Sequence, residues 1–236
     1  VMAHRGEAQA FFTQYKYIPV EFVFDGLFQT EADAQGQKQH GVFARAGDIR
    51  YKDISGPDGV PDGQIDNAYD RTHLGNPFPD LTYAFNVSFD WKGFDFSMFW
   101  QGVSGISNQN YVNMDVLELN TNFTERVLDA WTPNNTSGSW PRWGNMANNR
   151  WNGSSSYWIE DGSYLRLKNL ELGYTLPKKM ITDIGLSSVR VYFSGTNLLT
   201  ISNVEDYDPE KPWNDDRALT TYPLTKLYSL GFNLTF

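Results

Sequence analysis

The sequence contains no cysteine, so it forms no disulfide and offers no thiolate ligand to a metal ion. It also has no run of about 18 to 20 apolar residues, which is the length that a membrane-spanning helix needs. These absences exclude a disulfide-stabilised secreted domain and a helical membrane protein. They are compatible with an outer-membrane β-barrel, whose strands carry only a weak, alternating hydrophobic signal.

Residues and motifs typical of catalysis are also scarce. The three histidines, His4, His40 and His73, are scattered, and none stands in the H-x-x-H spacing of a metal site. The sequence has neither a G-x-S-x-G nucleophile motif nor a glycine-rich phosphate-binding loop. We therefore predict that the protein is not an enzyme and holds no cofactor other than the cation considered below.

Basic residues are outnumbered by acidic ones, 19 to 28, and the net charge is −9. This balance excludes a nucleic-acid-binding protein that relies on phosphate contacts. The chain begins V-M-A-H-R-G-E, which lacks the charged and then apolar pattern of an export signal. Either a signal has been removed or the start of the protein precedes this chain, and we favour the second explanation.

What the sequence does have is alternating hydrophobicity, most clearly at its carboxy-terminal end. The apolar positions there are Tyr228, Leu230, Phe232, Leu234 and Phe236. The residues between them are small or polar, and successive side chains of an extended strand point to opposite faces. A strand of this pattern that ends on an aromatic residue is typical of the closing strand of an outer-membrane barrel. We expect its apolar face to meet lipid and its polar face to line a lumen.

Other segments alternate in the same way. Leu81 to Trp91 and Phe94 to Trp100 predict two strands joined by a tight turn at Lys92-Gly93. Tyr164 to Leu176 predicts a strand whose phase slips at a bulge near Lys168-Asn169. Further strands are predicted at Val189 to Ile201 and, more weakly, at Tyr15 to Phe24, so that the total with the terminal strand is six.

The connections between the predicted strands alternate in length. Long connections fall at about 25–80, 102–162 and 202–223, and short ones at 92–93 and 177–188, the last with one predicted helical turn. Outer-membrane barrels have this asymmetry, with long loops outside the cell and short turns in the periplasm. Six strands are fewer than the minimum of about eight that closes such a barrel. We therefore predict an all-β fold, an antiparallel transmembrane β-barrel, of which residues 1–236 are the carboxy-terminal segment.

The most acidic stretch of the chain, from Asp48 to Asp70, contains a candidate cation site. A calcium ion takes several oxygen ligands from a loop that glycine allows to turn sharply. The candidate ligands are Asp53, Ser55, Asp58, Asp62 and Asp66. The alternative is a solvated cluster of turns, because Asp, Gly and Pro all favour turns, and Pro57 and Pro61 interrupt the spacing of a calcium-binding loop.

Tryptophan, asparagine and serine are abundant in the connection from 102 to 162. Flat aromatic rings beside amide side chains suit the binding of sugars or peptides. The candidate substrate-binding residues are Trp140, Trp143 and Trp151. The alternative is that these rings pack the loops together or lie at a membrane interface. In the same connection, Thr124 to Trp131 predicts two helical turns.

A series of longer motifs covers most of the chain. They are Y-I-P-V-E-F-V-F-D-G-L-F-Q-T-E-A-D-A (Tyr17 to Ala34), G-D-I-R-Y-K-D (Gly47 to Asp53), D-R-T-H-L-G-N-P-F-P-D-L-T-Y (Asp70 to Tyr83), W-K-G-F-D-F-S-M-F-W-Q-G (Trp91 to Gly102), Y-W-I-E-D-G-S-Y-L-R-L-K-N-L-E-L-G-Y (Tyr157 to Tyr174), G-T-N-L-L-T (Gly195 to Thr200), Y-D-P-E (Tyr207 to Glu210) and L-G-F-N-L-T-F (Leu230 to Phe236). In this order they resemble the carboxy-terminal region of the SusC/RagA family of TonB-dependent outer-membrane transporters from Bacteroidota. The chain departs from the family's D-x-N-G-D-G-x-I-D-x-x-D pattern, since Ser55 replaces the Asn and extra residues intervene before Asp70.

The resemblance implies a barrel of about 22 strands closed by a plug, in which this chain supplies roughly the last six strands and their long extracellular loops. Such proteins lie in the outer membrane of Gram-negative bacteria, surrounded by lipid, and import oligosaccharides or peptides. They work with a SusD-like surface lipoprotein and are powered through TonB, which contacts regions outside this chain. The final strand, Tyr228 to Phe236, would carry the signal read by the barrel-assembly machinery.

Two other functions stay open at this point. A soluble carbohydrate-binding or adhesive β-sandwich requires the apolar face of Leu81 to Trp91 to be buried in a core. A TonB-independent outer-membrane pore or secretion barrel has the same architecture, and differs from a TonB-dependent transporter in the sequence that precedes Val1.

Overall fold

The computed structural model describes residues 20–39, 41–110, 125–144, 155–181, 183, 185–204, 207–210 and 224–236. The chain forms two compact units. The first, which we call the loop unit, comprises Val1–Pro77, Ser107–Glu160 and Pro212–Leu219. The second, the sheet unit, comprises Phe78–Ile106, Asp161–Lys211 and Thr220–Phe236.

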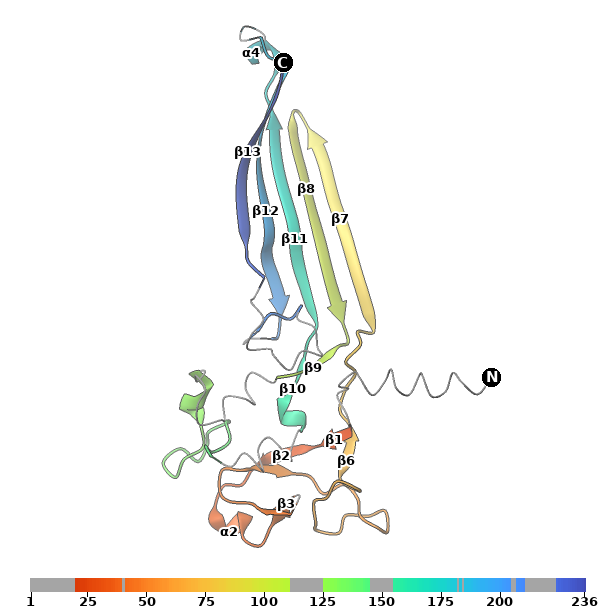
Figure 1. Cartoon of the computed structure of the whole chain (residues 1–236), viewed down its shortest axis with the longest axis vertical. Helices are drawn as coiled ribbons and strands as arrows, with labels where there is room; N and C mark the ends of the chain where they lie inside the picture. Colours follow the sequence, from red (N-terminus) through yellow and green to blue (C-terminus); the bar gives the residue numbers. More distant parts are fainter. Residues whose placement is uncertain are drawn as a thin grey trace, which may run out of the picture. The chain divides into compact units, whose positions relative to one another are not determined.

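The sheet unit is one antiparallel sheet of five long strands, which lie side by side in Figure 1. The strands are β7 (Leu81–Trp91), β8 (Phe94–Ser104), β11 (Tyr164–Thr175), β12 (Ser188–Ser202) and β13 (Leu227–Thr235), and their order across the sheet is β13-β12-β11-β8-β7. Each of them matches a strand predicted from alternating hydrophobicity. Every pair of neighbours is antiparallel, so the long connections all join the sheet at the same end.

The predicted hairpin turn between β7 and β8 is confirmed. Lys92 and Gly93 both adopt positive φ, 49° and 88°. Two consecutive residues with positive φ form the turn type whose twist matches that of paired strands. Glycine accepts this conformation without the clash that a Cβ introduces, which explains why Gly93 stands at the second position.

The predicted bulge in β11 is also confirmed. The register between β11 and both of its neighbours shifts between Leu167 and Asn169. Leu167 lies opposite Trp100, and Leu172 lies opposite Phe96, two positions that share one face of β8. The inserted residue Lys168 therefore brings the leucines on either side of the bulge to the same face of the sheet.

The first predicted strand, Tyr15 to Phe24, is not a member of this sheet within the part of the chain that the structure describes. Its described residues form β1 (Val20–Phe22), which pairs with β6 (Arg71–His73), and the start of β2 (Phe24–Leu27), which pairs with β5 (Ile49–Tyr51). Consecutive residues Glu21 and Phe22 are both buried, as occurs in a core strand and not in a two-faced one. Residues 15–19 lie outside the described ranges.

The loop unit has its own core, formed by Phe22, Leu27, Ile49, Tyr51, Trp140 and Trp158. Its other described elements are short: α2 (Glu31–Ala34), β3 (Lys38–Gln39), β4 (Val42–Phe43), β9 (Ser107–Gln109), η1 (Glu125–Asp129), η3 (Ser156–Trp158) and β10 (Ile159–Asp161). Two helical turns are predicted at Thr124 to Trp131, and the described residues there form one short 3-10 helix, η1. The helical turn predicted in the connection after β11 is α4 (Lys178–Ile181). No described helix has the length and apolarity to cross a membrane.

Candidate functional site

The two faces of the five-stranded sheet differ sharply in chemistry. Residues paired across the strands form rows, and two neighbouring rows lie on opposite faces. One row reads Phe89, Phe96, Leu172, Phe193 and Leu230, and the other Ser88, Ser97, Glu171, Ser194 and Ser229. We call these the apolar face and the polar face of the sheet.

Many large residues of the apolar face are exposed, although Leu167 and Val189 are buried. Phe89 is 55% exposed and Leu230 is 70% exposed. A soluble protein rarely leaves so large a contiguous apolar surface bare. The soluble β-sandwich alternative requires this face to be buried in a core, and it is not.

Aromatic pairs are spread along the apolar face of β7 and β8. Near the turn of the β7–β8 hairpin, the rings of Phe94 and Tyr174 lie 4.4 Å apart, beside Trp91. Farther along the same strands, Phe85 stacks on Trp100 at 6.0 Å. Between these pairs, Phe89 stacks on Phe96 at 5.1 Å, so aromatic rings continue along the face from the turn to Phe85.

The terminal strand carries the residues predicted to form the insertion signal, Tyr228, Leu230, Phe232, Leu234 and Phe236. All five are more than half exposed. Tyr228, Leu230, Phe232 and Leu234 lie opposite Gly195, Phe193, Val191 and Val189 of β12. The structure thus places them together on the apolar face, while their role in insertion stays a prediction.

Two charged clusters lie on the polar face. In the first, Arg190 forms ion pairs with Asp95 and Glu171, and so joins β12 to β8 and β11. The second is centred on Arg166, whose side chain is 3% exposed and pairs with Asp208 at 2.7 Å and with Glu210 at 2.6 Å. Sequence reasoning did not single out these residues, because the paired groups lie 19 to 95 positions apart in the chain.

The Arg166 cluster fastens the segment after β12 to the polar face. Asp208 Oδ1 also accepts the backbone N–H of Glu210, and its Oδ2 accepts that of Leu224. Burial acts to raise the pKa of Asp208, but the hydrogen bonds from Arg166, Glu210 and Leu224 and the charge of Arg166 together lower it. Asp208 therefore joins Glu210 and Leu224, which lie toward opposite ends of the connection between β12 and β13.

The five candidate cation ligands do not converge on one point. Asp53 accepts the backbone N–H of Gly63, and Asp62 accepts that of Gln64. Asp66 accepts the backbone N–H groups of Ala68 and Tyr69, while Asp58 and Ser55 form no part of this set of acceptors. Within the described residues, no group of three His, Asp or Glu side chains is arranged to hold a metal ion. Calcium binding at this stretch stays a prediction.

The organising residue of the acidic stretch is Asp70, which was not among the five candidates. It is 1% exposed, and its carboxylate accepts backbone N–H groups of Ile54 at 2.9 Å and Asp66 at 2.8 Å. It thereby ties both ends of the Asp53 to Asp66 loop together. The sequence feature that could have identified Asp70 is its position immediately before strand β6, because the strand holds the residue in place.

The three tryptophans predicted to bind substrate have different environments. Trp140 is 4% exposed and lines a cavity of about 220 Å³ in the loop unit. Trp143 packs against the hydrophobic core of that unit, as the alternative explanation holds. Trp151 lies outside the described residues. Substrate binding by any of them stays a prediction.

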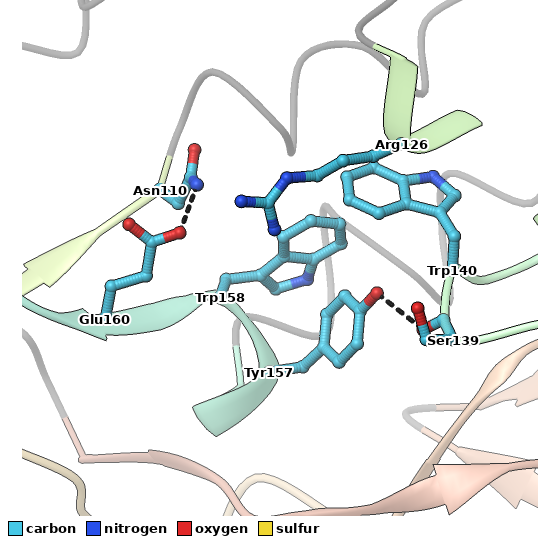
Figure 2. Close-up of a pocket in the computed structure, with 7 residues that line it drawn as sticks. All are labelled: Asn110, Arg126, Ser139, Trp140, Tyr157, Trp158 and Glu160. Atoms are coloured by element: carbon cyan, nitrogen blue, oxygen red, sulfur yellow. Dashed lines mark hydrogen bonds between the residues drawn. The ribbon is translucent and has the colours of Figure 1, made fainter. Parts of the chain in front are cut away.

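The cavity has an aromatic part and a polar part. Its lining residues are Asn110, Arg126, Ser139, Trp140, Tyr157, Trp158 and Glu160. Figure 2 shows Trp140 and Tyr157 on one side of the view and Asn110 with Glu160 on the other, with Trp158 and the guanidinium of Arg126 between them. The cavity therefore combines flat apolar surfaces with hydrogen-bonding groups of both charges.

The aromatic part is fixed by edge-to-face packing and by hydrogen bonds. The Trp158 ring lies 4.7 Å from the Tyr157 ring and 5.6 Å from the Trp140 ring, in each case T-shaped. Tyr157 donates its hydroxyl proton to the carbonyl of Ser139 at 2.8 Å, and burial raises the pKa of this tyrosine. The hydroxyl is therefore a neutral donor with a fixed partner, and the ring is held in place.

The polar part joins residues from distant segments. Asn110, which follows β9, donates an amide N–H to the carboxylate of Glu160 on β10. Arg126 comes from η1. Sequence reasoning missed Asn110, Arg126 and Glu160, because only the folded loops bring them beside Trp140.

The sequence of the chain is similar to those of several TonB-dependent receptors. The chain is 32% identical over 98% of its length to TonB-dependent receptor P3 of Formosa agariphila, and 33% identical over 92% to TonB-dependent receptor P26 of the same organism. It is 29% identical over 74% of its length to TonB-dependent receptor SusC of Bacteroides thetaiotaomicron. No family model matches the chain.

Among solved structures, the chain resembles the RagAB peptide transporter with a TM-score of 0.69, at 22% identity over 94% of this chain. It resembles the open-open state of the RagAB peptide importer with a TM-score of 0.63. At this identity the likeness concerns the fold, a segment of a barrel that is not closed here. The chain spans about a fifth of the proteins that it matches, 22% of receptor P3 and 23% of the RagAB chain.

Proposed function

Because the chain belongs to the SusC/RagA family of TonB-dependent receptors, we propose that it forms the carboxy-terminal wall of an outer-membrane importer. The five strands of the sheet unit cross the membrane, with the apolar face toward lipid and the polar face toward the lumen. The long connections lie outside the cell and contribute to substrate binding. The barrel, its plug and its contact with TonB are completed by the rest of the receptor.

The observation that carries this proposal is the largely exposed apolar face of the sheet, which is rich in aromatic residues. The strands β7 and β8 have 11 residues each, β11 has 12, β12 has 15 and β13 has 9. A tilted strand needs about 9 to 11 residues to cross the hydrocarbon core. The strands are thus long enough, and the alternation along them supplies one lipid-compatible face throughout.

We further propose a SusD-like surface lipoprotein as the extracellular partner and an oligosaccharide or peptide as the substrate. The named relatives support the class of transporter, since they are TonB-dependent receptors and one is SusC. They also favour a TonB-dependent importer over a passive pore of the same architecture. The protein's role is binding and passage of a substrate, and we propose no catalytic step.

The orientation of the two faces can be measured residue by residue. Single cysteines are introduced at Leu230 and at Ser229 in a full-length receptor whose other cysteines, where present, have been replaced. Each carries a spin label, and its accessibility to lipid-soluble oxygen and to a water-soluble nickel reagent is compared. We expect oxygen access at 230 and nickel access at 229. Equal access of both sites to the water-soluble reagent would contradict the membrane assignment.

The transport activity needs its own measurement. Deletion of the receptor gene, or of the TonB system, is expected to abolish growth on the substrate, and co-purification of the receptor is expected to recover a lipoprotein partner. Uptake that persists without TonB would favour the passive-pore alternative.

A further inference from the structure

We propose that the Y-D-P-E segment, Tyr207 to Glu210, narrows the lumen beside β11 and β12 and is held there by a latch of charged side chains that can open. We call this segment the strap. The latch consists of Arg166 and Lys168 of β11 with Asp208 and Glu210 of the strap. This inference rests on the proposed import function, because it takes the polar face as the wall of the lumen. It goes beyond that function in assigning a movable constriction to the wall.

The strap begins over the polar face and not beyond the end of the sheet. Strand β12 continues past Thr200 and ends at Ser202. Arg166 lies opposite Thr200 and donates from Nε to its hydroxyl at 2.8 Å, so the guanidinium is held at this row of the sheet. Asp208 binds the same guanidinium at 2.7 Å. The chain therefore turns back after β12 and returns to the level of Thr200.

The other end of the strap reaches farther along the polar face. The carboxylate of Glu210 accepts a hydrogen bond from Arg166 at 2.6 Å, and both of its oxygens accept from Nζ of Lys168, at 2.6 and 2.7 Å. Lys168 is the bulge residue of β11 and follows Arg166 in the direction of the β7–β8 turn. The strap therefore runs from the end of the sheet that carries the long connections toward the turn, along the wall of the lumen.

The strap covers one part of the polar face and leaves another part open. The side chains of Arg166 and Asp208 are only 3% and 9% exposed. In the same row, on the other side of the sheet, Ala84 of β7 is exposed. In the next row toward the turn, Asn169 of β11 and Asn86 of β7 share the polar face, and both are exposed. The constriction therefore lies on the side of β11 and β12.

The latch is balanced both in charge and in hydrogen bonds. It joins two cations to two carboxylates, so its formal charge is zero when the strap is docked. All three nitrogens of the Arg166 guanidinium donate, Nε to Thr200 and the other two to Glu210 and Asp208. Hydrogen bonds between oppositely charged groups are shorter and stronger than neutral ones. The docked position of the strap is therefore well defined.

A charged attachment suits a strap that detaches into water. An apolar anchor would expose hydrophobic surface to the lumen each time the strap left the wall. Carboxylate, ammonium and guanidinium groups instead recover their hydration on release, and the desolvation of a buried ion pair offsets much of its Coulomb attraction. The docked and released states of the strap are therefore close in free energy, which is the condition for a two-state element.

The test compares two single cysteines in the purified full-length receptor, from which any other cysteine has been removed. Asn169→Cys stands next to Lys168 of the latch. Asn86→Cys, two strands away in the same row and on the same face, is the matched control. Each is reacted with N-ethylmaleimide and with a bulky maleimide that carries a polyethylene glycol chain, and the two rates are measured. The latch is opened by the double substitution Asp208→Asn and Glu210→Gln, which keeps both side-chain shapes and removes both negative charges.

We expect N-ethylmaleimide to react at both positions. With the latch intact, the bulky maleimide should react at Asn169→Cys about tenfold or more slowly than at Asn86→Cys, yet to completion, because the strap opens transiently. In the double variant the rate at Asn169→Cys should rise to within about threefold of the control, since the ionic hydrogen bonds that hold the strap are lost. Glu210→Gln alone should give an intermediate rate, and it carries the test if the double variant does not fold. Mobility on unheated detergent gels identifies the folded variants.

Several results would overturn the inference. Equal rates of the bulky maleimide at both positions would show that the strap shields nothing, and no reaction of it at Asn169→Cys in any variant would make the strap a fixed part of the wall. Unchanged rates in the latch variants, or the same rise in Arg190→Met of the other cluster, would show that the latch charges do not hold it. No reaction of N-ethylmaleimide in this row would place the row outside the open lumen. The import function and the orientation of the faces are tested separately by TonB-dependent uptake and by the spin-label measurement, so a receptor that passes those tests and fails here disproves only the strap.

Discussion

Gly231 of β13 lies directly opposite Tyr192 of β12, and the tyrosine ring covers the bare backbone of the glycine. A Cβ added at position 231 would overlap the ring of Tyr192. The guanidinium of Arg190 lies 4.8 Å from the centre of the same ring. Because Gly231 has no side chain on the polar face, the ring of Tyr192 lies against its backbone, and this contact fixes the register of the terminal strand at its middle.

Gly231→Val is expected to disturb the pairing of the terminal strand. Overpacking costs about 1–3 kcal/mol, and here it falls on the last pair of strands. The folded fraction of the receptor in outer membranes should decrease, as measured by its mobility on unheated detergent gels. Ser229→Val, two residues away on the same face, is the control. Combining Gly231→Val with Tyr192→Ala should restore part of the loss, whereas an additive loss would show that the two residues do not interact.

The two faces of β8 should respond oppositely to a positive charge. Phe96 lies on the apolar face, and the adjacent Ser97 lies on the polar face opposite Glu171. An arginine on the lipid-facing side costs about 2–4 kcal/mol at the middle of a membrane and less toward its interfaces, so the cost at Phe96, the third residue of β8, should lie below this range. We expect Phe96→Arg to reduce the amount of folded receptor and Ser97→Arg to be tolerated. A stronger effect of Ser97→Arg would place lipid on the other face.

Replacement of Arg166 should loosen the attachment of Asp208, in the connection between β12 and β13, to the polar face. Breaking one partner of a buried ion pair costs about 3–5 kcal/mol, and Arg166→Met would leave Asp208 and Glu210 with Lys168 as their remaining cation in this cluster. The backbone N–H groups of Glu210 and Leu224, which both bond to Asp208, should exchange with solvent faster. Hydrogen exchange in the solubilised receptor measures this. Arg190→Met, in the other cluster, should leave these two amides protected.

Much of the sheet could be predicted from the sequence because its information is local. Alternation along β7 and β8 defines their faces, Lys92-Gly93 defines their turn, and the phase slip at Lys168 defines the bulge. Each of these signals depends on residues within one strand or turn. A membrane strand needs no matching core, so its own pattern is sufficient.

The loop unit could not be predicted to the same degree. Phe22 and Phe24 alternate as they would in a long strand, but the structure pairs their short segments with β6 and β5 around a shared core. The candidate cavity depends on Asn110, Arg126 and Glu160, whose proximity follows from the path of whole loops. Trp140 was predicted from its residue type alone, and its binding of a substrate stays a prediction. Asp70 was missed because its role depends on backbone groups of Ile54, Ser55 and Asp66 elsewhere in the chain.

Asp70 should be more important for the acidic stretch than the five candidate cation ligands. Asp70→Ala removes the acceptor of half-buried backbone N–H groups, among them those of Ile54 and Asp66, at a cost of up to about 1–3 kcal/mol each. We expect the 53–66 loop to exchange its amide hydrogens faster in this variant and to remain protected in Asp58→Asn, which changes an exposed candidate. A calcium chelator tests the predicted cation site separately, because it should leave the exchange of the loop amides unchanged if no calcium is bound there. Calcium-dependent protection that Asp58→Asn abolishes would instead establish the cation site.

Glu21 should make the loop unit sensitive to pH. It is 8% exposed, and burial raises its pKa from 4.5 to about 7, although Arg71 at 3.5 Å acts in the opposite direction. Because the folded-state pKa is higher than the unfolded one, this carboxyl favours the folded state at pH values below 4.5, and its contribution is lost as the pH rises through 7. Protection of the β1–β6 amides in the full-length receptor, corrected for intrinsic exchange, should therefore decrease between these pH values. Glu21→Gln, which stays neutral, should remove this dependence, and the exposed Glu31→Gln should retain it. A pH dependence that persists unchanged in Glu21→Gln would assign the effect to another group.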